Sequence, residues 1–510
     1  MLDEIKADAV FGVIGVCGIN GNLIARILSD NGYRVIANDT LSKDECRFLK
    51  ALNDYPDIEV YHGDIPETFY GQIDYAILPM ALVKSKSPLY QKITSLDIPV
   101  LTVHDICDFF EPTHPVICIT GTNGKTTTTS LLKHLAYHDG IIPAEHNLEG
   151  MQGNAGDIPA LQARLKSDVT ILETGTAGVK GSLTNLAGPC RPDVGLITNI
   201  TPDHLNESSS FIAYARVKSE LMSLLEEGTL VANSDDPMIM ALLEEVGYSG
   251  NLITFGMDYE STQKSTKECL CGKNVEIDEF IAGVGRYECD CGLKYTEPDY
   301  LACSINENHD AFTLKTPSDE VEFELAITGL HNIYNATGAI IIAHEILGIS
   351  YESIRQALLT FGGVKGRMEK IATMDNRVIM VDYAHNPAGI TTVLKELKNH
   401  YGRVVNVITT SSESGIEGDM NIMQNALEYA DIVVPASYNS YICAKKLMND
   451  DRFSDKIVLP EHMPKSTKVG TLGATLEQVL IGFNKSLDID ADLIVCTGEA
   501  AFKYKDKLLN

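Results

Sequence analysis

The chain has 510 residues, 44% of them apolar, and its 70 acidic and 41 basic side chains give a net charge of −29. This composition excludes collagen-like, coiled-coil and wholly disordered proteins, and the length suits two to four domains. The negative charge argues against nucleic acid or an anionic membrane as a partner, and no apolar run approaches the length of a membrane span. Residues 1–6 do not resemble a signal peptide, so we expect a cytoplasmic protein.

Apolar runs that resemble strands alternate with helical spacing along most of the chain. In the first 110 residues the predicted strands lie at 9–14, 33–37, 75–78 and 100–103, a pattern typical of a doubly wound parallel sheet. A proline-rich connector at 111–115 precedes a second unit with strands at 116–120, 169–172, 194–199 and 230–232. A glycine cluster at 362–367 opens a third, with strands at 378–381, 404–409, 432–434 and 493–496. We therefore predict three α/β domains, at 1–111, 112–362 and 363–510, with an insertion at 256–325.

A phosphate loop is predicted where the first strand of the second unit meets an amphipathic helix. The sequence there is Thr-Gly-Thr-Asn-Gly-Lys-Thr-Thr, residues 120–127. In such a loop the glycines let backbone amides face phosphate, the lysine reaches the outer phosphates and a threonine hydroxyl can hold Mg²⁺. The general pattern is not fully met, because Ile119 replaces its first glycine; the alternative is a glycine turn with a surface lysine. The strand–loop–helix context favours an ATP site at Gly121, Thr122, Asn123, Gly124, Lys125, Thr126 and Thr127.

The variant TGTNGKTT resembles the phosphate loop of the Mur ligase family, and further motifs follow it in the family's order. These are Glu173 at a strand end, Asn199-Ile-Thr-Pro-Asp-His204-Leu, Lys218 on a predicted helix, Asn233-Ser-Asp-Asp-Pro237, Gly329-Leu-His-Asn332-Ile-Tyr-Asn335, Gly366-Arg367-Met-Glu and Val381-Asp382-Tyr-Ala-His-Asn-Pro387. Taken singly, each motif also fits an ordinary loop, cap or surface residue. Together they cover nearly the whole chain.

The resemblance implies an ATP-dependent amide ligase with a role for each motif. The acceptor carboxylate would attack the γ-phosphate to give an acyl phosphate, which an incoming amine then displaces. Lys125 would neutralise phosphates, Thr126 and Glu173 would hold one Mg²⁺, and His204 a second. Lys218 matches a lysine that many members carbamylate, which would supply an oxygen ligand for the second metal. Asn332 would contact adenine, and Arg367 and Asp382 would close on ATP from the third domain.

Four of the twelve cysteines form two pairs, Cys269 with Cys271 and Cys289 with Cys291, each followed by glycine. Four thiolates can enclose structural Zn²⁺, although these pairs depart from the usual C-x-x-C spacing; reduced free cysteines are the alternative. The segment resembles the zinc ribbon of MurT-type ligases, which partner a glutaminase and lack a nucleotide-binding first domain. This chain has such a domain, which argues against that partner. Other cysteines in apolar context, such as Cys17, Cys107, Cys118 and Cys496, we expect to be buried free thiols.

The first domain carries a glycine-rich turn, Gly15-x-x-Gly18-x-Asn20-Gly21, and an acid, Asp39, after its second strand. A dinucleotide fingerprint is one interpretation, but the glycine spacing differs. The pattern is more similar to the UDP-binding domain of MurC- and MurD-type ligases, which would assign Gly15, Gly18, Asn20, Gly21, Asp39 and Thr40 to a UDP-linked substrate.

These features predict a three-domain ligase that joins a UDP-linked acceptor carboxylate to a free amino acid. The combination resembles the archaeal Mur ligase homologues of pseudomurein peptide synthesis. Two alternatives remain, a MurT-like amidating subunit that uses ammonia and a nucleotide-dependent binding protein without ligase turnover. The incoming amino acid is not readable from the sequence.

Overall fold

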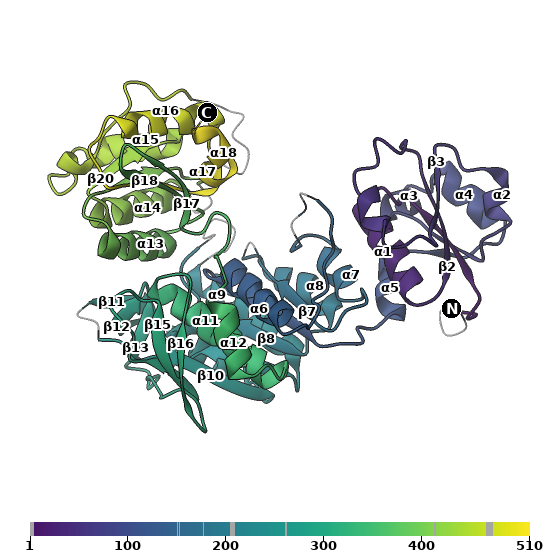
Figure 1. The fold of residues 1–510 in the computed structure, drawn as a ribbon, viewed down its shortest axis with the longest axis horizontal. Coiled ribbons are helices and arrows are strands. Elements are labelled where there is room, and N and C mark those ends of the chain that lie inside the picture. The colour runs from purple at the N-terminus through teal and green to yellow at the C-terminus, as the bar shows by residue number, and fades with distance from the viewer. Residues whose placement is uncertain are drawn as a thin grey trace. The chain divides into compact units, whose positions relative to one another are not determined.

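The computed structural model describes residues 5–149, 151, 153–176, 178–203, 210–260, 263–412, 415–465 and 473–509 (Figure 1). By contacts it divides into two compact units, one of residues 1–119, 139–175 and 183–195 and one of the remainder. In the part of the chain that the structure describes, no helix combines the length and apolar character needed to cross a membrane.

The first sheet is wholly parallel, with the strand order β3-β2-β1-β4-β5. Its elements are β1 (Val10–Ile14), α1 (Ile19–Asp30), β2 (Arg34–Asp39), η1 (Leu49–Leu52), β3 (Glu59–His62), α2 (Glu67–Tyr70), β4 (Tyr75–Ile77), α3 (Met80–Lys84), α4 (Pro88–Ser95), β5 (Val100–Leu101) and α5 (Val103–Phe109). The predicted doubly wound sheet is confirmed. Strand β3 escaped prediction because its sequence, Glu-Val-Tyr-His, is short, polar and only partly buried.

The structure corrects the expectation that Cys17 is a free thiol, because it forms a disulfide with Cys46. Cys17 follows β1 and Cys46 follows β2, and these neighbouring parallel strands end at the same edge of the sheet. Their Cα atoms lie 5.0 Å apart despite a separation of 29 residues in sequence. Sequence spacing alone conceals such a pair. Cys107, Cys118 and Cys496 are buried and free, as expected.

The second sheet has the order β16-β15-β14-β10-β9-β8-β6-β7. Its elements are β6 (Val116–Thr120), α6 (Lys125–His138), α7 (Ile158–Gln162), β7 (Thr170–Glu173), α8 (Ser182–Ala187), η2 (Gly188–Cys190), β8 (Val194–Ile197), α9 (Phe211–Leu225), β9 (Thr229–Asn233), α10 (Pro237–Val246), β10 (Asn251–Met257), β14 (Tyr300–Cys303), β15 (Ala311–Lys315), β16 (Glu320–Glu324), α11 (Leu330–Ile341), η3 (Ile342–Ile346) and α12 (Tyr351–Leu358). Helix α6 packs against α11 and α12, and the three lie side by side in Figure 1.

The cysteine pairs lie in the turns that follow β11 and β13 of a separate antiparallel sheet of the order β11-β12-β13, which we call the ribbon sheet. Its strands are β11 (Lys264–Glu268), β12 (Asn274–Ile281) and β13 (Val284–Glu288). Strands β14 to β16, which follow it in sequence, instead extend the second sheet. Residues 256–325, expected as one insertion, therefore contribute to two sheets.

The third sheet has the order β17-β18-β21-β19-β20, with only β17 antiparallel. Its elements are β17 (Glu369–Met374), β18 (Arg377–Asp382), α13 (Pro387–His400), β19 (Val404–Ile408), α14 (Gly415–Tyr429), β20 (Ile432–Pro435), α15 (Tyr438–Leu447), η4 (Ser454–Lys456), α16 (Leu476–Leu487), β21 (Leu493–Thr497), α17 (Glu499–Lys503) and α18 (Lys505–Leu508). Alternate residues of β19 serve opposite faces: Val404 and Ile408 pack against α13 to α15, whereas Val405 and Val407 pack against α16 and α17. Helices thus cover both faces, as the near-continuous apolar strands predict.

Candidate active site

The phosphate loop connects β6 to α6, and two of its glycines are required by close approaches. A Cβ on Gly121, which has φ of +141°, would lie 2.0 Å from Oγ1 of Thr198. A Cβ on Gly124, with φ of +89°, would lie 2.3 Å from Oδ1 of Asn335. Both positions combine a backbone conformation that favours glycine with no room for a side chain. The loop is therefore a tightly fitted structure rather than an open surface turn.

The segment after β8 holds this loop through a dense set of hydrogen bonds. Thr122 N donates to Asn199 O at 2.8 Å, and Asn123 N donates to Oδ1 of Asn199 at 3.1 Å. Thr201 N donates to Oγ1 of Thr122 at 3.0 Å, and Oγ1 of Thr198 donates to Asn123 O at 2.6 Å. Strands β6 and β8 are neighbours, so their carboxyl ends bring the two segments together. The geometry unites two motifs that the sequence separates by about 75 residues.

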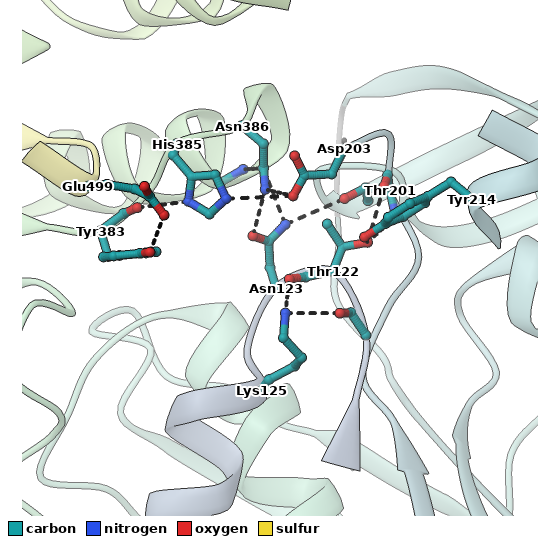
Figure 2. Close-up of polar contacts among 12 residues, drawn as sticks. Thr122, Asn123, Lys125, Thr201, Asp203, Tyr214, Tyr383, His385, Asn386 and Glu499 are labelled. Atoms are coloured by element: carbon teal, nitrogen blue, oxygen red, sulfur yellow. Dashed lines mark hydrogen bonds and ion pairs between the residues drawn. The ribbon is translucent and has the colours of Figure 1, made fainter. Parts of the chain in front are cut away.

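Lys125, the first residue of α6, turns its ammonium back over the loop (Figure 2). Its Nζ donates to Gly121 O at 3.0 Å and to Thr122 O at 2.7 Å. Thr126 and Thr127 follow in the first helical turn, where the helix dipole favours an anion. The Lys125 ammonium, the residue Thr126 with its hydroxyl and the start of α6 therefore lie close together, as the binding of a nucleoside triphosphate requires.

Residues of the third sheet reach the same loop, as Figure 2 shows. Nδ2 of Asn386 donates to Oδ2 of Asp203 at 3.0 Å and to Oδ1 of Asn123 at 3.2 Å. His385 lies beside it, with Nε2 3.7 Å from Oδ2 of Asp203. Arg367 donates through Nη2 to Oγ1 of Thr126 at 3.4 Å. The structure thus brings Arg367 to the phosphate loop, as the sequence leads us to expect.

Asp382 is 3% exposed and its carboxylate is occupied by backbone amides. Oδ2 accepts from Met368 N and Oδ1 from Ala384 N, both at 2.7 Å. It fixes the two turns that carry Arg367 and Tyr383, and the Arg367 guanidinium lies over the Tyr383 ring at 4.8 Å. Asp382 therefore orients neighbouring groups rather than presenting a bare carboxylate.

The predicted adenine element lies at the start of α11. Asn332 donates through Nδ2 to Thr328 O at 2.7 Å and accepts at Oδ1 from Asn335 at 3.2 Å. Asn335 in turn accepts at Oδ1 from the Thr128 hydroxyl of α6 at 3.2 Å. Asn332 and the phosphate loop are thereby linked through Asn335, which the sequence analysis did not single out.

Of the four residues assigned to Mg²⁺, three lie outside the phosphate loop. Lys218 is 1% exposed on α9, and its Nζ lies 5.1 Å from the centroid of the Tyr214 ring. Tyr214 contacts Thr122 of the phosphate loop, with the two hydroxyl oxygens 3.2 Å apart, and burial raises the pKa of this tyrosine. Glu173 is the last residue of β7 and is partly buried. His204 lies outside the described residues.

The four ribbon cysteines converge, with their sulfur atoms all within 4.8 Å of one another. The Sγ atoms of Cys269 and Cys291 lie 3.8 Å apart, and those of Cys271 and Cys289 lie 3.7 Å apart. A tetrahedral Zn²⁺ with bonds of about 2.3 Å separates its sulfurs by about 3.8 Å, so the geometry fits zinc. A backbone hydrogen bond from Leu293 lowers the pKa of Cys291, whereas burial raises that of Cys269. Both knuckles repeat one pattern, in which the glycine amide bonds back to the first cysteine.

The glycine turn of the first sheet is also a close-packed structure. A Cβ on Gly21 would lie 2.3 Å from Gly15 O, and Gly18 caps α1. Asp39 holds the turn rather than standing free: Oδ2 accepts from Cys17 N at 2.9 Å, and Oδ1 accepts from Leu41 N at 3.0 Å. Asn20 donates through Nδ2 to Oδ2 of Asp157 at 2.7 Å, and Thr40 is exposed. The predicted set is thus gathered at the carboxyl edge of β1 and β2.

Several residues that contact one another at the site were not predicted from the sequence to be functional. They are Thr198, Asn199, Thr201, Asp203, Tyr214, Asn335, His385, Asn386 and Glu499, whose carboxylate accepts from the Tyr383 hydroxyl. The sequence motifs at 199–205, 329–335 and 381–387 predicted that these segments belong to the site. They did not indicate which of these residues make the contacts. Tyr214 gave no signal, because it reads as one more apolar residue of an amphipathic helix.

Comparisons with known proteins agree with this geometry. Residues 119–343 match the model of the Mur ligase middle domain, and residues 366–455 match that of the Mur ligase, glutamate ligase domain. The chain is 26% identical over 499 residues to UDP-N-acetylmuramate–L-alanine ligase of Bradyrhizobium sp. strain BTAi1, covering 95% of this chain and 93% of that one. MurF from Acinetobacter baumannii shares the fold, with a TM-score of 0.59 at 18% identity and 81% coverage of both chains.

A further solved structure matches almost end to end. This is a pseudomurein peptide ligase type C from Methanothermus fervidus, 33% identical, with a TM-score of 0.85 and coverage of 98% of this chain and 99% of that one. The chain belongs to the Mur ligase family.

Proposed function

We propose that this protein is an ATP-dependent ligase that forms a peptide bond between a UDP-linked acceptor carboxylate and a free amino acid in pseudomurein synthesis. The observation that carries the proposal is the full-length likeness, at 33% identity, to a pseudomurein peptide ligase. That match includes the first sheet, whose glycine turn suits a UDP-linked substrate. Residues 1–111 would bind this substrate, 112–362 ATP and 363–510 the amino acid.

The chemistry begins with a carboxylate, which is a poor electrophile in water. Attack of an acceptor carboxylate oxygen on the γ-phosphate breaks the bond to ADP and leaves an acyl phosphate; the amine then attacks the acyl carbon and expels phosphate. The amine must lose its ammonium proton before that attack. Lys125 and the amides at the start of α6 would hold the phosphates, and Arg367 approaches this loop from the third sheet.

Two kinds of metal ion fit the chain. Thr126 and Glu173 would hold one Mg²⁺, and His204 with a carbamylated Lys218 a second. These ions would reduce the repulsion between phosphate and carboxylate. The four ribbon cysteines would hold one structural Zn²⁺, since their spacing suits a closed tetrahedral site.

Two alternative functions are separated by the requirements for phosphate release. A MurT-like amidating subunit would release phosphate with acceptor and ammonia, and a binding protein would not require both acceptor and amine. We expect release only when ATP, a UDP-linked acceptor and an amino acid are all present. Screening amino acids against several UDP-linked acceptors would also identify the pair that reacts.

The mutational test is Lys125→Ala, with Lys133→Ala on the same helix as the matched control. Removing the Lys125 ammonium should abolish ligation, by about 100-fold or more, without unfolding the protein, because a preorganised cation at the phosphates contributes to the transition state. Lys133→Ala should retain activity. Ligation by Lys125→Ala at the wild-type rate would overturn the assignment of the ATP site.

A further inference from the structure

A buried ion pair joins the ribbon sheet to the second sheet. Nζ of Lys267, on β11, lies 2.6 Å from Oδ1 of Asp236, and the two side chains are 3% and 0% exposed. Lys267 also donates to Gly283 O at 3.2 Å. A buried pair of charges is costly to desolvate, so it requires close geometry and additional hydrogen bonds. Both conditions are met here.

Asp236 also connects this ion pair to the active site through hydrogen bonds. Its Oδ1 also accepts from Met238 N at 2.9 Å, which caps α10, and its Oδ2 accepts from Ile200 N at 2.7 Å. Ile200 precedes Thr201, whose amide bonds to the phosphate-loop residue Thr122. A continuous set of bonds therefore leads from the ribbon sheet to the phosphate loop.

Packing follows the same route as the hydrogen bonds. Gly283, in the turn between β12 and β13 with φ of +71°, approaches Thr201 closely enough that a Cβ would lie 3.6 Å from its Cγ2. Gly285 N donates to Asp235 O at 2.9 Å, and the apolar cluster around Cys269 and Cys289 packs against Met240 of α10. The ribbon sheet is thus seated against the segment 200–203 rather than appended to the surface.

We propose that Lys267 is a positioning residue for the ligase reaction. By holding the Asp236 carboxylate in place, it anchors the Ile200 amide and so keeps residues 200–203 against the phosphate loop. This inference rests on the proposed function, in which the phosphate loop that this segment contacts binds ATP. It assigns the ribbon sheet a role in catalysis besides holding a metal.

The test uses Lys267→Met, which keeps the apolar stem and removes the charge, and Lys264→Met as its control. Lys264 lies on the same strand, is 78% exposed and pairs with Asp278 at 3.4 Å. We expect Lys267→Met to lower kcat by about 10- to 100-fold, the scale reached when a reacting group is misplaced by about 1 Å. The KM for ATP should change by less than about threefold, because Lys125 and the loop amides are retained. Lys264→Met should match the wild type.

Amide hydrogen exchange tests the same inference without catalysis. The peptide 196–203 should exchange faster in Lys267→Met, whereas α6 peptides should be unchanged. A wild-type kcat together with wild-type exchange of this peptide would overturn the proposal. If the wild type itself lacks ligase activity, the proposed function is wrong. The exchange result still shows whether Lys267 keeps residues 200–203 in place.

A second variant covers the case in which Lys267→Met unfolds or loses zinc. Lys267→Met with Asp236→Asn removes both charges, so no unpaired charge remains buried. Ile200 N and Met238 N bond to different oxygens of Asp236, and asparagine replaces one of these oxygens with an NH₂ donor, so it cannot keep both bonds in this geometry. We expect this variant to keep its zinc and a melting temperature near that of the wild type, yet remain slow. Wild-type kcat in a folded, zinc-bound double variant would also overturn the proposal.

Discussion

Asn386 donates a hydrogen bond to Asp203 across 183 residues of sequence, at 3.0 Å between Nδ2 and Oδ2. The same side chain caps α13, since its Oδ1 accepts from Gly389 N at 2.8 Å. One amide thus fixes the start of a third-sheet helix and contacts the segment that follows β8. This double use explains how the third sheet can bring Arg367 and His385 to the phosphate loop in a defined orientation.

Asn386→Asp separates these two uses. Aspartate caps a helix as well as asparagine does, so α13 should keep its start, and a loss in the free energy of unfolding should come only from the two buried carboxylates that then face each other. A carboxylate facing Asp203 would instead repel it, so kcat should fall by about tenfold or more. Steady-state kinetics and thermal melting measure both effects. Ser350→Asp, at the cap of α12, is the control, and equal losses in both variants would contradict the role of Asn386.

The disulfide of the first sheet should contribute to stability. Opening the Cys17–Cys46 loop by Cys46→Ser should lower the free energy of unfolding by about 2–4 kcal/mol, because the cross-link restricts the unfolded chain. A reductant should lower the melting temperature of the wild type but not that of the variant. Cys107→Ser, at a free buried cysteine, should show the wild-type response to reductant. Mass spectrometry that finds both Cys17 and Cys46 as free thiols in native protein would contradict the bond.

The ribbon cysteines should bind metal at about one Zn²⁺ per chain. Cys289→Ser should lose zinc and lower the melting temperature by several degrees, because metal binding stabilises only the folded ribbon. Cys303→Ser, at a buried cysteine on β14 outside the cluster, should retain zinc. Metal analysis of freshly reduced protein checks the prediction, and protein that is free of zinc would favour the alternative of four free thiols.

Burial gives Asp235 an unusual protonation behaviour. Desolvation raises its pKa to about 7, against hydrogen bonds from the Tyr334 hydroxyl and Met257 N; Arg286 also lowers it, while Asp236 raises it. A carboxyl whose folded pKa exceeds the unfolded value contributes stability that is full below about pH 4 and lost as the pH rises through about 7. Asp235→Asn should therefore flatten the pH dependence of stability in this window.

Denaturant unfolding of both proteins between pH 5 and 8 measures this difference. Since native protein binds the extra proton, the wild type should lose more stability than Asp235→Asn as the pH rises. Glu244→Gln, on α10, is a control for losing one negative charge. Parallel curves for the wild type and Asp235→Asn would show that another group dominates the pH dependence.

Much of the fold was predictable because its strands are apolar runs that end in polar functional residues. The phosphate loop, with Gly121 and Lys125, stands between two such elements and was identified directly. Strands β14 to β16 could not be assigned to a sheet, since the sequence of a strand of four or five residues does not identify the strand that pairs with it. The Cys17–Cys46 bond was concealed for the same reason: its partners meet only through the pairing of β1 and β2.

For the active site, too, the local sequence predicted some features, whereas others depend on contacts between distant parts of the chain. Motifs predicted which segments would meet, but not which side chains would touch. Thr198 and Asn335 matter because they fill the space that Gly121 and Gly124 leave, a relationship visible only in three dimensions. Lys267 could not be identified from the sequence, because nothing local indicates that Asp236 faces it.

Lys218 provides the sharpest test of a Mur-type mechanism. It is 1% exposed on α9, which begins seven residues after His204, so both side chains could serve one ion. Carbamylation would convert this buried cation into an anionic oxygen ligand. Lys218→Ala should lower ligase activity by about 100-fold while ATP still binds, because Lys125 and the loop amides remain.

Chemical rescue distinguishes a lost oxygen ligand from a damaged helix. Formate or acetate, entering the space that the lysine leaves, should restore part of the rate of Lys218→Ala by supplying a carboxylate to the metal. Chloride at matched ionic strength is the control for a salt effect. Arg216→Ala, on the same helix with an exposed side chain paired to Glu245, controls for the helix itself and should remain active without formate. Full activity of Lys218→Ala, or equal rescue by chloride, would rule out the carbamate and leave His204 to hold its metal with water.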